Sequence, residues 1–467
     1  MNTLILLVGL RPWSALSWQS LLTRVFVAIS VFSVEVQIAT WLGVGSIYTL
    51  PIVNAILAVV SSVAWRHPGR GAQSSRVRLF QAVPLAAALS LAGLVLLLNL
   101  ALPLTAADQY HLEKIEKIEA TGTLQYDVNV ELKFNVLPSL YELLLADFEQ
   151  IPLVGPTIVR LHGFLGLLLY LIAVGTVRDL LSTSMVQDAN GGSGTIHKSP
   201  EWVWAAMVTV PVLFHQLVLV KNDLFAAVPG LVALTWVVTR AQRASWREIV
   251  WASWMAGLAV AIKFTAILLL IMMGITVLIT RRRESWRPAA SLALGSFLGM
   301  LSGGLIFAFV ENMLVYGNMM PVGEMGARNS GISESLAMIA RFGLSLFDLG
   351  LLTRTWWPAR GGWGGTFGLP FIWAVVVLLT YVRKIPEARR ALCFAVIIFL
   401  VFSGTFPEAD LAQRIVLAPG LMLIAMAAQI VMQGNGVRAR FRAALVVVLL
   451  LSTIQIGRSA VLYLQQL

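Results

Sequence analysis

Four polar residues in the segment 105–151 are of types that perform acid–base chemistry. Asp108 stands just ahead of Tyr110 and His111, and Glu142 follows later in the same segment. A carboxylate at a water–membrane boundary can take a proton from an attacking hydroxyl, so Asp108 is the candidate general base. Two structural interpretations stay open, because Asp108 also suits the N-cap of a helix and Glu142 also suits a solvated helix face.

Cationic side chains near the ends of apolar runs are candidates for binding a phosphate group. Lys221 shares a minimal turn with Asp223, and Lys263 interrupts a long apolar run. Arg360 lies in a segment rich in tryptophan and glycine, and Arg414 opens a late apolar run. Arginine forks match phosphate oxygens, and ionisable groups at membrane depth favour a functional role. The alternatives are a polar turn, a snorkelling lysine, an aromatic belt and a charged anchor at a helix end.

The composition predicts that these residues are positioned by a polytopic α-helical membrane protein. Of 467 residues 58% are hydrophobic and only 12% are charged, whereas a soluble domain carries about 25% charge. Continuous apolar runs long enough to cross the bilayer fill most of the chain, which favours helices over an alternating β-barrel pattern. The net charge of +11 comes from basic clusters between these runs, which indicates membrane topology and not nucleic-acid binding.

The apolar runs predict about 11–13 transmembrane helices. Their expected ranges are 22–42, 45–65, 80–104, 153–177, 202–220, 224–239, 249–262, 264–280, 289–310, 367–382, 391–406, 415–433 and 443–463. The positive-inside rule then places 22 of the 34 Lys and Arg residues in the cytoplasm. Nine acidic residues fall in the segment 105–151, which is expected to be the first long outer loop.

One apolar run, 249–280, is too long for a single span and has basic clusters at both ends. If both clusters are cytoplasmic, the run must turn back near its middle, at Lys263. Two arms of about 14–17 residues reach roughly 21–26 Å, enough for the outer part of a bilayer. The sequence therefore predicts a helical hairpin with Lys263 at its outer tip. The alternative is one long tilted helix with a snorkelling lysine.

The predicted outer loops carry amphipathic helices. Leu112, Ile115 and Ile118 fall on one helical face of a charged stretch, which predicts an interfacial helix. Leu137–Ile151 and Ser333–Leu349 have similar patterns, and the solvated-face interpretation of Glu142 extends to Asp147.

The chain is expected to divide into a two-span extension, residues 1–79, and a membrane catalytic domain, residues 80–467. The second domain carries outer loops 105–151 and 311–366. The glycines of the later loop favour a mobile segment whose backbone approaches a ligand.

Several common chemistries lack their sequence signatures. The chain has no Walker A loop, no HExxH pair and no GxSxG motif, and its single cysteine, Cys393, excludes a cysteine-rich metal site.

Taken together, the motifs resemble the GT-C class of membrane glycosyltransferases, especially bacterial relatives of the protein O-mannosyltransferase and aminoarabinose-transferase type. The matching motifs, in chain order, are Asp108 with Tyr110, His111 and Gly122; Glu142-Leu143; Lys221-Asn222-Asp223-Leu224; Gly257 to Ala266 around Lys263; Tyr316-Gly317-Asn318-Met319-Met320-Pro321; and Arg414. They cover residues 80–430, most of the chain.

The resemblance implies a transfer reaction on the outer face of a bacterial inner membrane. A sugar would leave a polyprenyl-phosphate carrier for a glycan, lipid or protein acceptor, with Asp108 as the base. Tyr110, His111, Glu142, Asp223 and the cations would hold the substrates, and one base with one leaving group would invert the anomeric carbon. Some members of the class hold a divalent metal, for which the candidate ligands are Asp108, Glu142 and Asp223, so a metal cofactor stays open.

Three other functions remain possible from the residues alone. A secondary transporter or lipid flippase would concentrate ionisable groups near the midplane, where only Glu35 is expected. A polyprenyl-linked glycan ligase would need a large late outer loop, which 311–366 supplies. A non-catalytic scaffold would give Asp108 no special role.

Overall fold

The computed structural model of this chain is helical throughout the part that it describes, and that part contains no strand. The described residues are 2–9, 17–43, 47–48, 50–51, 54–55, 82–101, 109–124, 139–153, 157, 160–188, 201–218, 222–281, 286–319, 332–346, 367–405, 416–432 and 437–464. The expected all-α class is therefore confirmed.

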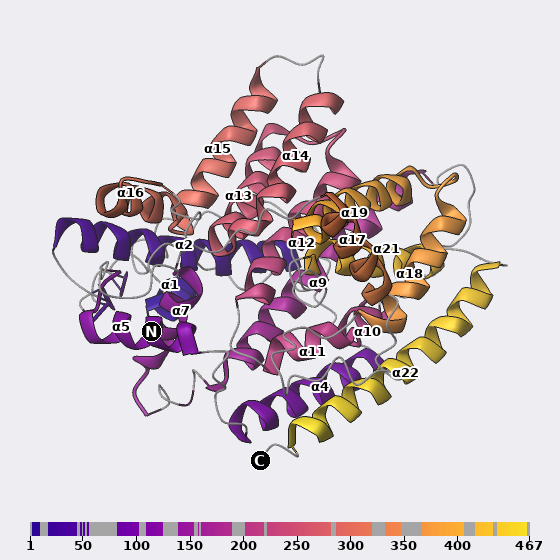
Figure 1. Cartoon of the computed structure of the whole chain (residues 1–467), viewed down its shortest axis with the longest axis horizontal. Helices are drawn as coiled ribbons and strands as arrows, with labels where there is room; N and C mark the ends of the chain where they lie inside the picture. The colour runs from indigo at the N-terminus through magenta and orange to yellow at the C-terminus, as the bar shows by residue number, and fades with distance from the viewer. Residues whose placement is uncertain are drawn as a thin grey trace.

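The helices follow the chain in an order close to the predicted one (Figure 1). They are α1 (Asn2–Gly9), α2 (Trp18–Leu42), α4 (Ala82–Ala101), α5 (Gln109–Thr121), α7 (Leu140–Glu149), α9 (His162–Asp188), α10 (Glu201–Val208), α11 (Pro211–Val218), α12 (Asp223–Arg240), α13 (Trp246–Ile262), η2 (Phe264–Ala266), α14 (Ile267–Thr280), α15 (Arg287–Ser302), α16 (Leu305–Tyr316), α17 (Ile332–Leu346), α18 (Gly368–Tyr381), α19 (Pro386–Thr405), α21 (Leu417–Met432) and α22 (Val437–Leu464).

The long run 249–280 folds back on itself, as predicted. Helix α13 ends before Lys263, whose backbone is extended, and α14 returns after the short turn η2. At the opposite end the Arg281 guanidinium donates hydrogen bonds of 2.8 and 2.9 Å to the carbonyls of Gln242 and Ala244. Because these carbonyls lie just ahead of α13, both ends of the run meet, and Lys263 lies at the tip of the hairpin.

Glycines bring the backbones of α13 and α15 into direct contact. A Cβ added at Gly299 would lie 2.3 Å from the Trp254 carbonyl oxygen, and one at Gly295 would lie 2.3 Å from that of Val250. Small residues at spacing four allow such close approach between membrane helices. We call this contact, formed by Gly257, Gly295 and Gly299, the glycine seam. It fixes the direction of α13 and hence the position of Lys263.

Fewer of the described helices are long enough to cross a membrane than the sequence predicted. Within the described residues four helices are long and apolar enough to cross a bilayer, namely α2, α9, α12 and α22 in their apolar parts, and a fifth is possible if bent α15–α16 counts as one span. Shorter apolar helices lie in α4, α14, α18 and α21. The count of 11–13 spans therefore stays a prediction, and the range 45–65 lies mostly outside the described residues.

Three predicted spans differ from the helices observed. The range 202–220 is split into α10 and α11, because Pro211 lacks the N–H that would continue the first helix. The range 289–310 bends by 67° between α15 and α16, at Gly303 and Gly304. The span predicted from residue 153 begins only at His162.

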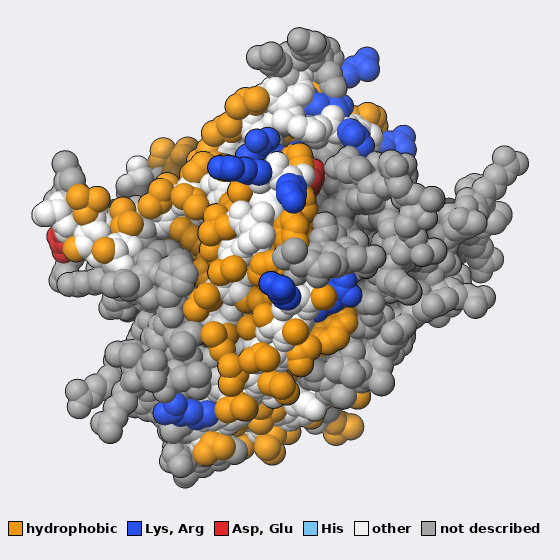
Figure 2. All heavy atoms as spheres, turned by 90° about the vertical axis from the view of Figure 1, so that its right-hand side faces the viewer, with side chains coloured by type: hydrophobic (Ala, Val, Ile, Leu, Met, Phe, Trp, Pro, Cys, Tyr) orange, Lys and Arg blue, Asp and Glu red, His pale blue; other side chains and the backbone are white. Residues whose placement is uncertain are grey.

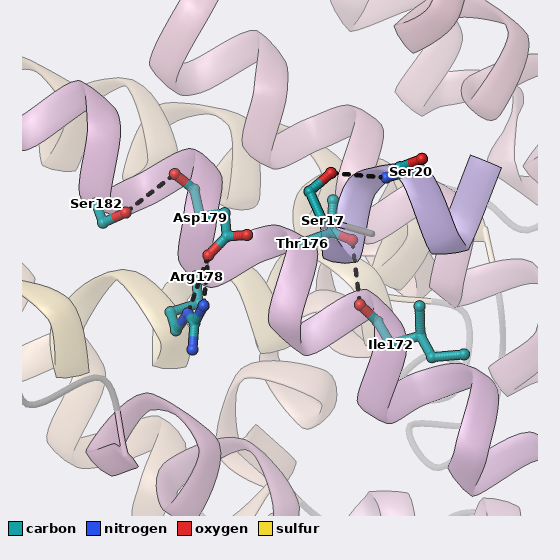
Figure 3. Close-up of polar contacts among 7 residues, drawn as sticks. All are labelled: Ser17, Ser20, Ile172, Thr176, Arg178, Asp179 and Ser182. Atoms are coloured by element: carbon teal, nitrogen blue, oxygen red, sulfur yellow. Dashed lines mark hydrogen bonds and ion pairs between the residues drawn. The ribbon is translucent and has the colours of Figure 1, made fainter. Parts of the chain in front are cut away.

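The start of α2 packs against the middle of α9 (Figure 3). Ser17 caps α2 by accepting a hydrogen bond from the Ser20 amide at 3.1 Å, and a Cβ on Gly175 would lie 2.3 Å from the Trp18 ring. One turn further along α9, Arg178 donates to the neighbouring Asp179 at 2.6 Å. The predicted boundary at residue 79 stays a prediction, but α2 is packed onto the rest of the bundle.

Apolar side chains cover much of the described surface on the side shown in Figure 2, and the Lys and Arg side chains there lie mainly towards one end. Exposed leucine, isoleucine and valine residues occur on α14, α15, α19 and α22. Such surfaces suit lipid contact. The fold is that of an integral membrane protein.

Candidate functional site

Helices α5 and α7 pack together and form a layer beside the bundle. Their apolar stripes pair at the contact, where Ile115, Ile118, Leu140 and Leu143 are buried. The predicted amphipathic helices in the segment 105–151 are therefore present. We call α5 and α7, together with α1, the loop layer; it lies below and to the left of α13–α15 in Figure 1.

A buried charge cluster lies between α5 and α7. His111 Nδ1 is 2.6 Å from Glu142 Oε1, and both side chains are almost fully buried. Burial alone would raise the pKa of the Glu142 carboxyl, but the charge of Lys114 and the hydrogen bond from His111 outweigh it, so this pKa is held below its ordinary value. Burial lowers the pKa of the Lys114 ammonium, and the Glu142 charge opposes that change.

This cluster corrects the predicted outward orientation of two helical faces. Lys114 belongs to the charged stretch around Leu112, Ile115 and Ile118, whose polar face was expected to be exposed, but it is buried beside Glu142 of α7. Glu142 and Asp147 suited a solvated face, yet their exposed fractions are 1% and 0%. The reason is that each carboxylate has polar partners on a neighbouring helix, which offset the cost of leaving water.

Aromatic contacts join the loop layer to the start of α12. The Tyr141 ring lies edge-on to His111 with a centroid distance of 5.5 Å, and its centroid is 5.8 Å from that of Phe225. Phe225 is two residues after Asp223 in the first turns of α12. The contact places the His111–Glu142 pair and the beginning of α12 in adjacent layers.

Asp223 and Lys263 form an ion pair between the start of α12 and the end of α13. The Asp223 side chain is buried, whereas a fifth of the Lys263 side chain remains exposed. Asn222 supports the same junction by donating to the carbonyl of Ile262 at 3.3 Å. A carboxylate in the first turn of a helix also interacts favourably with the helix dipole. The arrangement holds a partly exposed lysine at the turn between α13 and α14.

The structure brings together four of the candidate site residues, in two neighbouring pairs: His111 with Glu142, and Asp223 with Lys263. Sequence reasoning named all four but did not pair them. It missed Lys114 as a buried partner and Tyr141 with Phe225 as the link, and no pattern within a single helix marks those contacts.

Of the remaining candidates, only Tyr110 lies within the described part of the chain. Helix α5 begins at Gln109, directly after Asp108 in the sequence, and includes Tyr110. Positions and side-chain contacts are not described for Asp108, Lys221, Arg360 and Arg414, nor side-chain contacts for Tyr110. Their roles stay predictions.

The described carboxylates do not fit a metal site as they lie. Glu142 is held by His111 and Lys114, and Asp223 is held by Lys263. Within the described ranges no three His, Cys, Asp or Glu side chains converge. A carboxylate already paired with a buried cation would have to break that pair to bind a metal, so no chemical step is assigned to one.

The later predicted loop, 311–366, begins inside helix α16. Its Tyr316-Gly317-Asn318 motif ends that helix, with Gly317 in the left-handed conformation at φ +67°, and the buried Asn312 donates to the Met319 carbonyl at 3.0 Å. The predicted amphipathic stretch 333–349 is helix α17. The tryptophan- and glycine-rich segment that follows lies outside the described residues.

Comparison with known proteins reveals a similar fold but no relative in sequence. No protein-family model matches the chain, and no curated protein matches it. A crystal structure of ArnT from Cupriavidus metallidurans bound to undecaprenyl phosphate is similar with a TM-score of 0.50 and 16% identity, over 81% of this chain and 75% of that one. The polytopic helical fold expected from the GT-C resemblance is thereby confirmed.

Proposed function

We propose that this protein is a membrane glycosyltransferase that moves a sugar from a polyprenyl-phosphate carrier to an acceptor on the outer face of a bacterial inner membrane. The observation that carries the proposal is Lys263, a partly exposed cation at a helix-hairpin tip, held by buried Asp223 beside the loop layer. The ArnT-like fold supports it, since that neighbour was crystallised with undecaprenyl phosphate.

The proposed sugar transfer requires a general base and an anion-stabilising group on opposite sides of the sugar. Asp108 takes the proton of the acceptor hydroxyl, whose oxygen bonds to the anomeric carbon. The bond from that carbon to the phosphate oxygen breaks, and its electron pair leaves with the polyprenyl phosphate. One displacement of this kind inverts the anomeric carbon.

Lys263 is suited to the charge that develops on the departing phosphate. A preorganised cation in a site with little water stabilises such charge without reorganising during the reaction. Asp223 fixes the ammonium position but leaves part of the lysine side chain exposed for a second oxygen. Lys221, Arg360 and Arg414 are proposed as further phosphate ligands, and Tyr110, His111 and Glu142 as substrate ligands next to the base.

The segment 311–366 is proposed to close over the bound donor. Exclusion of water protects an activated sugar from hydrolysis, and loops that order on binding commonly supply it. The acceptor is a glycan, lipid or protein hydroxyl, because the proposed base acts on a hydroxyl group.

The test is sugar transfer by purified protein supplied with a radiolabelled polyprenyl-phosphate sugar. Replacing Asp108 by Asn should reduce turnover by about a thousandfold or more, within the usual range for general-base catalysis, while leaving the protein monodisperse. Glu113→Gln, a change of another acid in the same segment, should leave turnover unaltered. Undiminished transfer by the Asp108→Asn variant would reject Asp108 as the base, and donor translocation without transfer would favour a flippase.

A further inference from the structure

Within the loop layer, Asp147 of α7 binds the first turn of helix α1. Its Oδ1 accepts hydrogen bonds from the Asn2 amide at 2.8 Å and from the Asn2 side chain at 2.9 Å. Its Oδ2 accepts from the Thr3 amide at 2.9 Å. All three residues are buried, and 144 or more positions separate the partners in the chain. One carboxylate therefore satisfies two backbone amides that the helix itself cannot.

This contact is stronger than an ordinary surface cap. The first amides of a helix have no partner inside it, and a carboxylate there gains from charge-assisted hydrogen bonds and from the helix dipole. The Asn2 side chain also donates to the Ile47 carbonyl at 3.1 Å and accepts from the Asn54 side-chain Nδ2 at 2.8 Å. Three segments of the chain thus converge on one buried network, which we call the α1 clamp.

The clamp holds one end of α7, and the charge cluster holds the other. Glu142, five residues before Asp147 in this ten-residue helix, contacts His111 of α5. A short helix held at both ends cannot rotate or slide without breaking one set of buried polar contacts. The position of the Glu142 carboxylate therefore depends on α1 as well as on α5.

We propose that Asp147 is a positioning residue for the candidate site: by docking α1 onto α7, it sets the register of Glu142 against His111, next to the start of α5. This inference rests on the proposed function for its effect on turnover, but not for its effect on structure. It also gives α1 a role in the site, as the helix that Asp147 docks onto α7.

Activity and structure are measured on the same purified variants. Asp147→Asn keeps one acceptor oxygen but sets an amide donor against one helix amide, and Asn2→Ala removes only the side-chain bonds. The matched control is Glu113→Gln, an acid on α5 that takes no part in the clamp. For Asp147→Asn we expect transfer to fall about tenfold to a hundredfold in kcat with KM within about threefold, as misplacement of catalytic geometry produces. Turnover by the Asn2→Ala variant should fall less, and the Glu113→Gln variant should match the parent.

A double-mutant cycle separates positioning from general loss of packing. If Asp147 acts through Glu142, adding Asp147→Asn to Glu142→Gln costs little further turnover. Simple addition of the two effects would overturn the proposal.

Hydrogen exchange supplies a readout that needs no turnover. Asp147→Asn should speed amide exchange in α7 and also in α5, although the hydrogen bonds of the clamp run to α1, while Glu113→Gln should leave exchange in both helices unchanged. If the parent transfers no sugar, the proposed function fails and the exchange result alone decides the clamp. Unchanged exchange in α5 overturns the proposal, as does faster exchange with unaltered kcat in an active parent.

Discussion

The glycine seam and the loop layer hold helices together by opposite means. At the seam, α13 and α15 touch through their backbones because Gly257, Gly295 and Gly299 have no side chains to keep them apart. In the loop layer, α5 and α7 are joined by a buried carboxylate with two basic partners. The glycine seam requires residues without a side chain, whereas the loop layer requires charged side chains at defined positions.

The difference assigns distinct tasks to the two regions. In a membrane, apolar side chains gain little free energy by moving from lipid into a contact between helices, because lipid tails are equally apolar. Close backbone contact is what makes the frame rigid there. A buried charge cluster destabilises the protein when one charged partner is missing. When all partners are present, the cluster orients each of its side chains. The seam thus sets the hairpin tip at Lys263, and the layer sets His111 and Glu142 beside it.

The largest effect is expected at the seam. Gly299→Leu would force its Cβ to within 2.3 Å of the Trp254 carbonyl oxygen, so the helices must separate. We expect a loss of more than about 3 kcal/mol, at or beyond the upper end for overpacking, because backbone cannot rotate aside. The measurement is thermal unfolding in detergent. Gly93→Leu on α4, where nothing lies within 4 Å, is the control and should change little.

In the loop layer, Glu142→Gln should be nearly as damaging. It leaves Lys114 buried without its compensating charge, and removing one partner of a buried ion pair costs about 3–5 kcal/mol. Chemical denaturation would measure the loss, with Glu116→Gln, an exposed acid on α5, as the control. A loss equal to that of the control would show that the cluster contributes no stability.

The junction of α4, α9 and α11 combines both means and should give an intermediate effect. The Asn99 side chain donates to the Leu217 carbonyl at 3.0 Å and accepts from the Gly163 amide at 3.0 Å, where the two backbones approach closely. Asn99→Ala should cost about 1–3 kcal/mol, since it leaves a buried donor and acceptor unpaired. Stability equal to the parent would mean that other groups satisfy them.

The smallest effect is a pH dependence at the far end of the loop layer. Burial, followed by the hydrogen bond and charge of Glu149, raises the pKa of Glu119 to about 8. Because this pKa lies above the ordinary value of 4.5, the stabilisation is complete in acid and is lost as pH rises from about 4.5 through 8. The thermal midpoint should fall by about 1–3 °C across that window. Glu119→Gln should flatten the curve, and an equally steep curve would contradict the assignment.

The sequence predicted the frame better than the site. The hairpin at Lys263 could be predicted because basic clusters at both ends of one run must lie on the same side. The spacing of Gly295 and Gly299 also carries a readable signal for close helix packing. Apolar periodicity likewise predicted α5, α7 and α17.

The polar contacts of the site could not be predicted in this way. Within its own helix, Lys114 has the pattern of a solvated lysine. Its burial is possible because the Glu142 carboxylate, from α7, compensates its charge. Asp147 is similar, since its partners in α1 lie more than 140 positions away. Such contacts depend on how separate helices are placed, and no local pattern encodes that placement.

The most direct test of the account is a titration of the purified protein with undecaprenyl phosphate. The Lys263→Met variant removes the cation at the hairpin tip, and Lys384→Met removes an exposed lysine in the turn between α18 and α19. The account predicts that Lys263→Met weakens binding by about tenfold or more, as loss of a charge-assisted contact should, while Lys384→Met binds like the parent. Equal affinity in all three proteins, or no binding by the parent, would contradict it.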